Sequence, residues 1–200
     1  MGMIWRLSIP KSEEKSPESD EPFKFKDYFK RVADRLVDRH PSASTIICVN
    51  DVYDHPHATK EDERIQRQKN VGVIPNEFFR EQDVFPHRNK FQKILQSAEN
   101  KKRLQKCLYK FIKEKAIQRS LEMIYSVGKE CKHLANDSDV HSLKFDHSEA
   151  DTIMISIYGE IRKDGKRTPI VLDSADTDVY VAAAHASHQF AGDFLIKKEG

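Results

Sequence analysis

The chain has 200 residues, 38% of them hydrophobic and 33% charged, with a formal net charge of +2 at pH 7. This length suits one domain with a single core, and no apolar run reaches the roughly 18 residues that a membrane span needs. Three cysteines, Cys48, Cys107 and Cys131, form no CxxC pair, which favours reduced thiols over a disulfide framework. We therefore expect an intracellular protein, nuclear or cytoplasmic, with no membrane partner.

The first 87 residues divide into five parts. Residues 1–22 join a short apolar patch to the run KSEEKSPESDEP, which predicts a partial first strand and a disordered connector. Apolar residues then recur at helical spacing over 23–39, which predicts an amphipathic helix. The β-branched run STIICV at 44–49 predicts a strand, and a charged helix is expected within 51–68. Residues 70–87, with two prolines, are expected to be irregular.

The rest of the chain alternates helical and extended patterns. Residues 88–119 carry an apolar stripe on two strongly basic helical segments. Further strands are expected at 122–127, 141–145, 170–172 and 194–196, and further helices over 149–161 and 179–186. Because alternating strands and helices favour parallel pairing, we predict an α/β fold with a mainly parallel central sheet and helices on both faces. We expect one domain over 23–200, with the basic helices at 88–119 as an insertion.

Acidic residues follow the predicted strands, or begin the predicted helices, at three places. They are Asp51 with Asp54, then Glu149 with Asp151, then Asp173 with Asp176 and Asp178. In a parallel sheet these positions lie along one edge and can converge. Converging carboxylates stay ionised only around a cation, and clusters of oxygen ligands suit Mg²⁺ or Mn²⁺. The simpler interpretation is that these acids are helix caps and solvated loop charges.

Two acidic motifs, EADT at 149–152 and SADTDVYVAA at 174–183, resemble the paired motifs of the flap endonuclease and XPG-like branch of the PIN nuclease superfamily. VNDVYDHPHATKEDERIQRQ resembles the Lys- and Arg-rich segment of uncharacterised animal proteins of that type. NKFQKILQSAENKKRLQKCL resembles their Asn-Lys-x-x-Leu helix. The resemblance extends from about Phe25 to Val181. It implies a PIN-like fold, metal-dependent cleavage of nucleic-acid phosphodiesters, and a chain truncated at both ends relative to the family.

The resemblance also implies roles for individual residues. Metal-ligand positions, with Mg²⁺ or Mn²⁺ as cofactor, fall on Asp51, Glu149, Asp151, Asp176 and Asp178. The segment that contacts phosphates near the scissile bond contains Lys60, Arg64 and Arg67.

The basic segment at 88–119 suggests a second kind of site. It holds eleven Lys or Arg against two acids, which suits either a solvated helix face or a surface for the DNA or RNA backbone. In the second case the contacts are expected at Lys102, Arg103 and Lys106. Two functions therefore remain open: a divergent or truncated metal-dependent nuclease, and a catalytically inactive nucleic-acid-binding or interaction module that keeps the fold.

Overall fold

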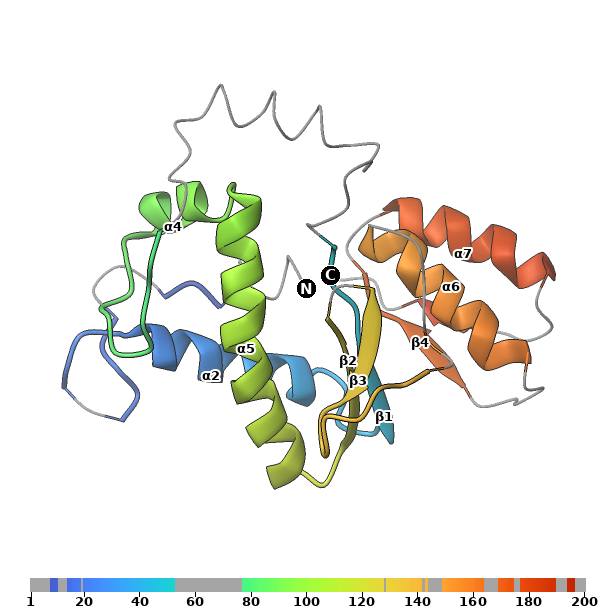
Figure 1. Cartoon of the computed structure of the whole chain (residues 1–200), viewed down its shortest axis with the longest axis horizontal. Helices are drawn as coiled ribbons and strands as arrows, with labels where there is room; N and C mark the ends of the chain where they lie inside the picture. Colours follow the sequence, from blue (N-terminus) through green and yellow to red (C-terminus); the bar gives the residue numbers. More distant parts are fainter. Residues whose placement is uncertain are drawn as a thin grey trace.

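The computed structural model describes residues 8–10, 14–18, 20–52, 77–127, 129–141, 143, 149–163, 169–174, 177–189 and 194–196. Figure 1 shows the helices and strands of this part of the chain. The helices are α2 (Phe25–Asp38), α4 (Arg88–Ile94), α5 (Ala98–Gln118), α6 (Ala150–Lys163) and α7 (Thr177–Gln189). The strands are β1 (Thr45–Cys48), β2 (Glu122–Val127), β3 (Glu130–His133), β4 (Ile170–Leu172) and β5 (Phe194–Ile196).

Most of the expected elements are confirmed, with boundary shifts of a few residues. The helix expected within 51–68 lies outside the described residues, apart from its first two positions. The strand expected at 141–145 is wrong where it can be judged, because residue 141 is in a turn and residue 143 is not in a strand. Leu143 is buried there, with its N–H bonded to the carbonyl of Val140. Its apolar side chain is therefore part of the core although its backbone forms a turn.

The strands form two small sheets instead of one central sheet. In the first, β1 pairs with β2 in parallel and β2 pairs with β3 antiparallel, in the order β1-β2-β3. The second, as far as the described residues go, is the parallel pair β4 and β5. The prediction of a mainly parallel central sheet is therefore wrong for the first sheet, which is mixed. Only two residues separate β2 from β3, and a connection that short can join only antiparallel strands.

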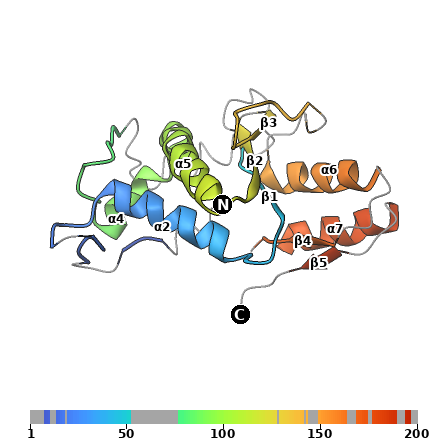
Figure 2. The same cartoon turned by 90° about the horizontal axis from the view of Figure 1, so that it is seen from below.

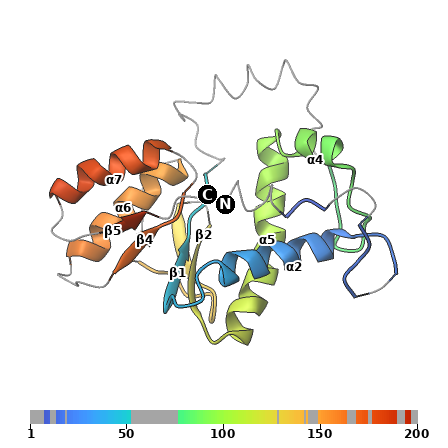
Figure 3. The same cartoon turned by 180° about the vertical axis from the view of Figure 1, so that it is seen from behind.

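The three-stranded sheet lies between two groups of helices (Figures 1 and 2). α2 and α5 pack together on one side, and α6 and α7 pack together on the other. Figure 3 shows the same arrangement from behind, with β4 and β5 beside α6 and α7. Both elements of the coarse prediction, strands and covering helices, are present. No helix in the described part of the chain is long and apolar enough to cross a membrane.

The larger core is built mainly from aromatic rings. α2 places Phe25, Tyr28 and Phe29 on one face, the i, i+3, i+4 spacing of an amphipathic helix. The ring of Tyr28 lies 4.8 Å from that of Phe85 in the loop before α4, and Phe85 lies 4.6 Å from Phe91 of α4. The N–H of Phe85 also bonds the carbonyl of Phe23 at 2.8 Å. This irregular loop is thus held by both rings and backbone.

We predict that Phe91→Ala lowers the free energy of unfolding by about 3–5 kcal/mol, because it leaves a cavity in this aromatic core. Phe91 is fully buried and touches the rings of Phe25, Tyr28 and Phe85. The measurement is equilibrium unfolding in urea. Phe78→Ala is the matched control, since Phe78 is 71% exposed and its loss should cost less than about 0.5 kcal/mol. Equal losses in the two variants would contradict the assignment of the core.

Candidate functional site

The end of β1 is where the chain brings polar groups against α6. Val49 and Val52 are buried in a second apolar cluster, which also contains Ile153 and Ile157 of α6. Asn50, between them, donates its backbone N–H to the Ser126 hydroxyl at 2.7 Å and its side-chain amide to the Ser126 carbonyl at 3.3 Å. These contacts hold the backbone after β1 in one position. The Oδ1 atom of Asn50 is buried and accepts no hydrogen bond from any residue that the structure describes.

Asp51 follows directly and reaches the first turn of α6. Its Oδ1 accepts a hydrogen bond from the N–H of Ala150 at 3.0 Å, although the two residues are 99 positions apart. Gln105 of α5 donates its side-chain amide to the Asp51 carbonyl at 3.4 Å. Asp51 therefore lies beside the segment that carries Glu149 and Asp151. A carboxylate at this position is also stabilised by the helix N-terminus, as the cap interpretation requires.

The remaining acids of the proposed ligand set are only partly described. α6 and α7 both begin at the end nearest the three-stranded sheet, so Asp151 and Asp178, each in a first turn, lie at the same end of the helix pair (Figures 1 and 2). Asp178 is exposed. Asp54 and Asp176 lie outside the described residues. Within the described residues, no three Asp, Glu, His or Cys side chains are grouped so that they could hold a metal ion.

Asp173, the first acid after β4, contacts two basic residues from the end of α2. Its carboxylate accepts hydrogen bonds from Nε and Nη2 of Arg39, the latter at 2.9 Å, and lies 2.7 Å from Nε2 of His40. Burial raises the pKa of Asp173, but the hydrogen bonds and charges of Arg39 and His40 outweigh this, so the pKa lies below its ordinary value. The three residues join the end of α2 to the end of β4. We call this group the Asp173 clasp.

Sequence reasoning missed both basic members of the Asp173 clasp. Arg39 and His40 follow the last turn of α2, where the pattern indicated only that the helix ends before Pro41. Their partner is more than 130 residues away, and no local spacing connects the two segments. The single available signal was the surplus of carboxylates at the start of α7, which required cationic or hydrogen-bonding partners somewhere in the fold.

The basic helices are extensively paired with carboxylates. Ion pairs join seven of the eleven cations of 88–119 to acids, and five of the six acids belong to other segments. Lys115 pairs with Asp34 of α2 and Lys110 with Glu81, for example. Much of the positive charge seen in the sequence is therefore balanced locally. This favours the solvated-face interpretation for the C-terminal half of α5.

Near the N-terminus of α5, by contrast, the ion pairs lie within the helix itself. Lys102 and Arg103 share Glu99 on their own helix, and Arg103 also donates to the Glu77 carbonyl at 3.2 Å. Lys106 is exposed and, like Arg88 and Lys93, makes no ion pair with any described residue. The pairs that Lys102 and Arg103 form with Glu99 lie within one helix. Such pairs are weak, and another anion can readily replace the glutamate. Lys60, Arg64 and Arg67, the other expected phosphate contacts, lie outside the described residues.

Comparison of the chain with protein families, with characterised proteins and with solved structures gives no match. Its function must therefore be inferred from the motif residues and from the geometry of the described site.

We predict that Asp173→Asn lowers the free energy of unfolding by about 1.5–3 kcal/mol at pH 7, because it removes a charged acceptor from Arg39. The pKa of Asp173 is lower in the folded chain than its ordinary value, so the clasp stabilises the fold above that value. The contribution is lost as the pH falls through the lowered pKa. The difference between variant and parent should therefore shrink below about pH 4 in urea unfolding.

Glu160→Gln is the control for this experiment. Glu160 forms an exposed pair with Lys163 one turn along α6, and such pairs contribute less than about 0.5 kcal/mol. A loss for Asp173→Asn that is as small as that of the control, or that does not change with pH, would show that the clasp does not stabilise the fold.

Proposed function

We propose that the chain is a divergent relative of the flap endonuclease and XPG-like PIN nucleases, acting on nucleic-acid phosphodiesters with Mg²⁺ or Mn²⁺. One observation carries the proposal: the Asp51 carboxylate lies on the N-terminus of α6, beside Glu149 and Asp151. The EADT motif and the end of β1 are about 100 residues apart in sequence, and the resemblance requires them to share one site. The simpler cap interpretation explains the Asp51–Ala150 hydrogen bond but not the motif order along the chain.

The proposed cation ligands are Asp51, Glu149, Asp151, Asp176 and Asp178. All are carboxylates, the ligand type that Mg²⁺ and Mn²⁺ prefer. When bound, such an ion supplies an activated water for attack on phosphorus and balances charge on the phosphate. Asp51 would be positioned for this by the buried valines on either side of it and by the Asn50–Ser126 contacts. Asp173 is not included, because Arg39 already balances its charge and His40 lies within hydrogen-bonding distance of its carboxylate.

Basic residues would hold the nucleic acid. Lys60, Arg64 and Arg67 are proposed to contact phosphates near the scissile bond. Lys102, Arg103 and Lys106 are proposed to contact the backbone further away. Gln105, next to Lys106 on α5, donates to the Asp51 carbonyl, so this part of α5 lies close to the end of β1. A single strand bound at Asp51 could therefore extend to this part of α5.

We predict that the purified chain cleaves flap or single-stranded DNA in Mn²⁺ and that EDTA stops the reaction. Asp51→Asn should reduce the rate on the order of 100-fold, because an amide is a poorer cation ligand than a carboxylate. Its Oδ1 can still accept the Ala150 N–H, so the fold should persist. Asp176→Asn should act similarly.

Glu160→Gln, on the exposed face of α6, should cleave at the parent rate. Circular dichroism of each variant would verify folding. Cleavage that survives in both Asp51→Asn and Asp176→Asn, or that persists in EDTA, would contradict the metal assignment.

A second function, nucleic-acid binding without cleavage, is favoured by a separate observation. Lys106, Arg88 and Lys93 are exposed and make no ion pair with any described residue. A module of this kind needs only the positive surface. It predicts binding in EDTA and no cleavage in Mn²⁺.

We predict that replacing Lys102, Arg103 and Lys106 together by Gln weakens binding to labelled single-stranded DNA or RNA. The slope of log affinity against log salt should fall by about 2, at roughly 0.7 for each lost phosphate contact. Fluorescence anisotropy in EDTA across a KCl series measures it. Lys163→Gln, at the end of α6, is the control and should leave the slope unchanged. An unchanged slope in the triple variant would exclude this part of α5 as the binding surface.

A further inference from the structure

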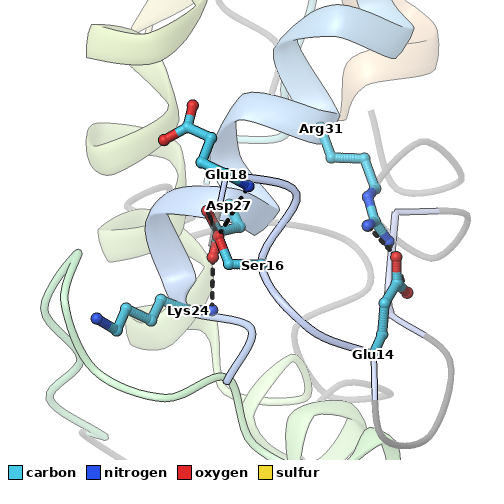
Figure 4. A network of polar contacts seen from close by, with 6 residues as sticks. All are labelled: Glu14, Ser16, Glu18, Lys24, Asp27 and Arg31. Carbon is cyan, nitrogen blue, oxygen red and sulfur yellow. Dashed lines mark hydrogen bonds and ion pairs between the residues drawn. The ribbon is translucent and has the colours of Figure 1, made fainter. Parts of the chain in front are cut away.

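Ser16 is a buried hydroxyl in a segment that is otherwise highly charged. It is 7% exposed, and its Oγ–H donates to Oδ1 of Asp27 at 3.0 Å. The other oxygen of Asp27 accepts the backbone N–H of Lys24 at 2.9 Å, which caps the start of α2. Figure 4 shows Ser16 and Lys24 converging on Asp27. Asp27 is only 3% exposed, so both of its oxygens depend on these two donors.

Hydrogen bonds and ion pairs of the described residues hold the segment around Ser16 on α2. Residues 14–18 and 20–22, within the expected disordered connector, form a turn closed by a hydrogen bond from the Ser16 N–H to the Glu21 carbonyl at 2.9 Å. Glu18 pairs with Lys30 at 2.6 Å, and Glu14 pairs with Arg31. Ion pairs near the surface contribute little, so the segment can open locally without unfolding the core. The Ser16–Asp27 bond is the buried contact among those that hold it.

The sequence around Ser16 has the form that proline-directed protein kinases recognise, a serine followed directly by proline. Pro17 follows Ser16, whereas glutamate follows Ser12 and aspartate follows Ser19. Thr168-Pro169 is the other Ser/Thr-Pro pair of the chain, and Thr168 lies outside the described residues.

We propose that Ser16 is a phosphorylation site for a proline-directed kinase, and that the phosphate releases residues 14–22 from α2. In the reaction, Ser16 Oγ forms a bond to the γ-phosphorus of a nucleoside triphosphate. The bond from that phosphorus to the bridging oxygen breaks, and the nucleoside diphosphate leaves. The hydroxyl proton passes to a base of the kinase. The local opening of the segment presents Ser16 to the enzyme.

Release follows from what the phosphate does to Asp27. Phosphorylation removes the hydroxyl proton that Asp27 accepts and places about two negative charges at that position. Asp27 has no freedom to withdraw, because its other oxygen caps α2. The surrounding cleft offers no excess of positive charge, since four carboxylates and three cations line it. Like charges and desolvation therefore oppose the docked state.

Lys30 and Arg31 are the groups that could reverse this outcome. Both are close enough to the segment to pair with its acids, Glu18 and Glu14. A phosphate that displaced those carboxylates and bound the two cations would tighten the segment instead. Amide hydrogen exchange distinguishes release of the segment from its tightening.

The test treats the full chain with a proline-directed kinase and ATP, locates phosphate by peptide mass spectrometry, and follows amide hydrogen exchange over residues 14–28. We expect phosphate on Ser16, lost in Pro17→Ala, and exchange at the Ser16 and Lys24 amides that is faster by about tenfold or more. Absence of phosphate on Ser16 would overturn the proposal. Unchanged or slower exchange after phosphorylation would overturn it as well.

Asp27→Asn provides a matched variant. The amide Oδ1 can still accept the Lys24 N–H, while its NH₂ group can donate to the phosphate that the carboxylate would repel. Phosphorylation of this variant should change exchange by less than about twofold. An increase in exchange as large as in the parent chain would show that repulsion by Asp27 is not the cause of release.

Discussion

The parallel pairing of β1 with β2 is the constraint on which the rest of the structure depends. Side chains alternate across these two strands, so that Ile46, Cys48, Met123 and Tyr125 enter the aromatic core with α2 and α5. Ile47 and Ile124 enter the second cluster with α6. A shift of one residue in this register would turn each of these side chains to the opposite face of the sheet and disrupt both cores. The same pairing carries the chain from Cys48 to Asn50 and Asp51 at the N-terminus of α6.

Charge in this protein is mostly balanced between elements that are distant in sequence. The Asp173 clasp joins α2 to β4, the basic α5 pairs with acids of α2 and of the loop before α4, and the segment around Ser16 covers cations of α2. Isolated surface pairs contribute little, whereas buried Asp27 and partly buried Asp173 contribute more. Function, in either proposed form, would use the acids near the start of α6 and the cations near Lys106.

How far the sequence predicted the molecule depends on the range of the interaction. The stripe over 23–39 predicted α2, and the EADT run predicted that acids begin α6, because both patterns repeat within one or two helical turns. The missed strand β3, with the sequence ECKH, has no apolar alternation to reveal it. It forms because a short turn after β2 returns the chain to a free sheet edge. The run at 141–145 has that alternation, yet Leu143 is buried from a turn.

The sequence by itself determined most of the helical segments, most of the extended ones, and that carboxylates collect where they begin or end. These properties depend on neighbours within a few residues, and side-chain periodicity reports them directly. Only the tertiary structure decided which carboxylates meet which partners. Asp51 lies on α6, Asp173 lies between Arg39 and His40, and Asp27 binds Ser16. Each contact joins residues 11 to 134 positions apart, so its energy depends on how two elements distant in sequence pack together, and no local pattern records that.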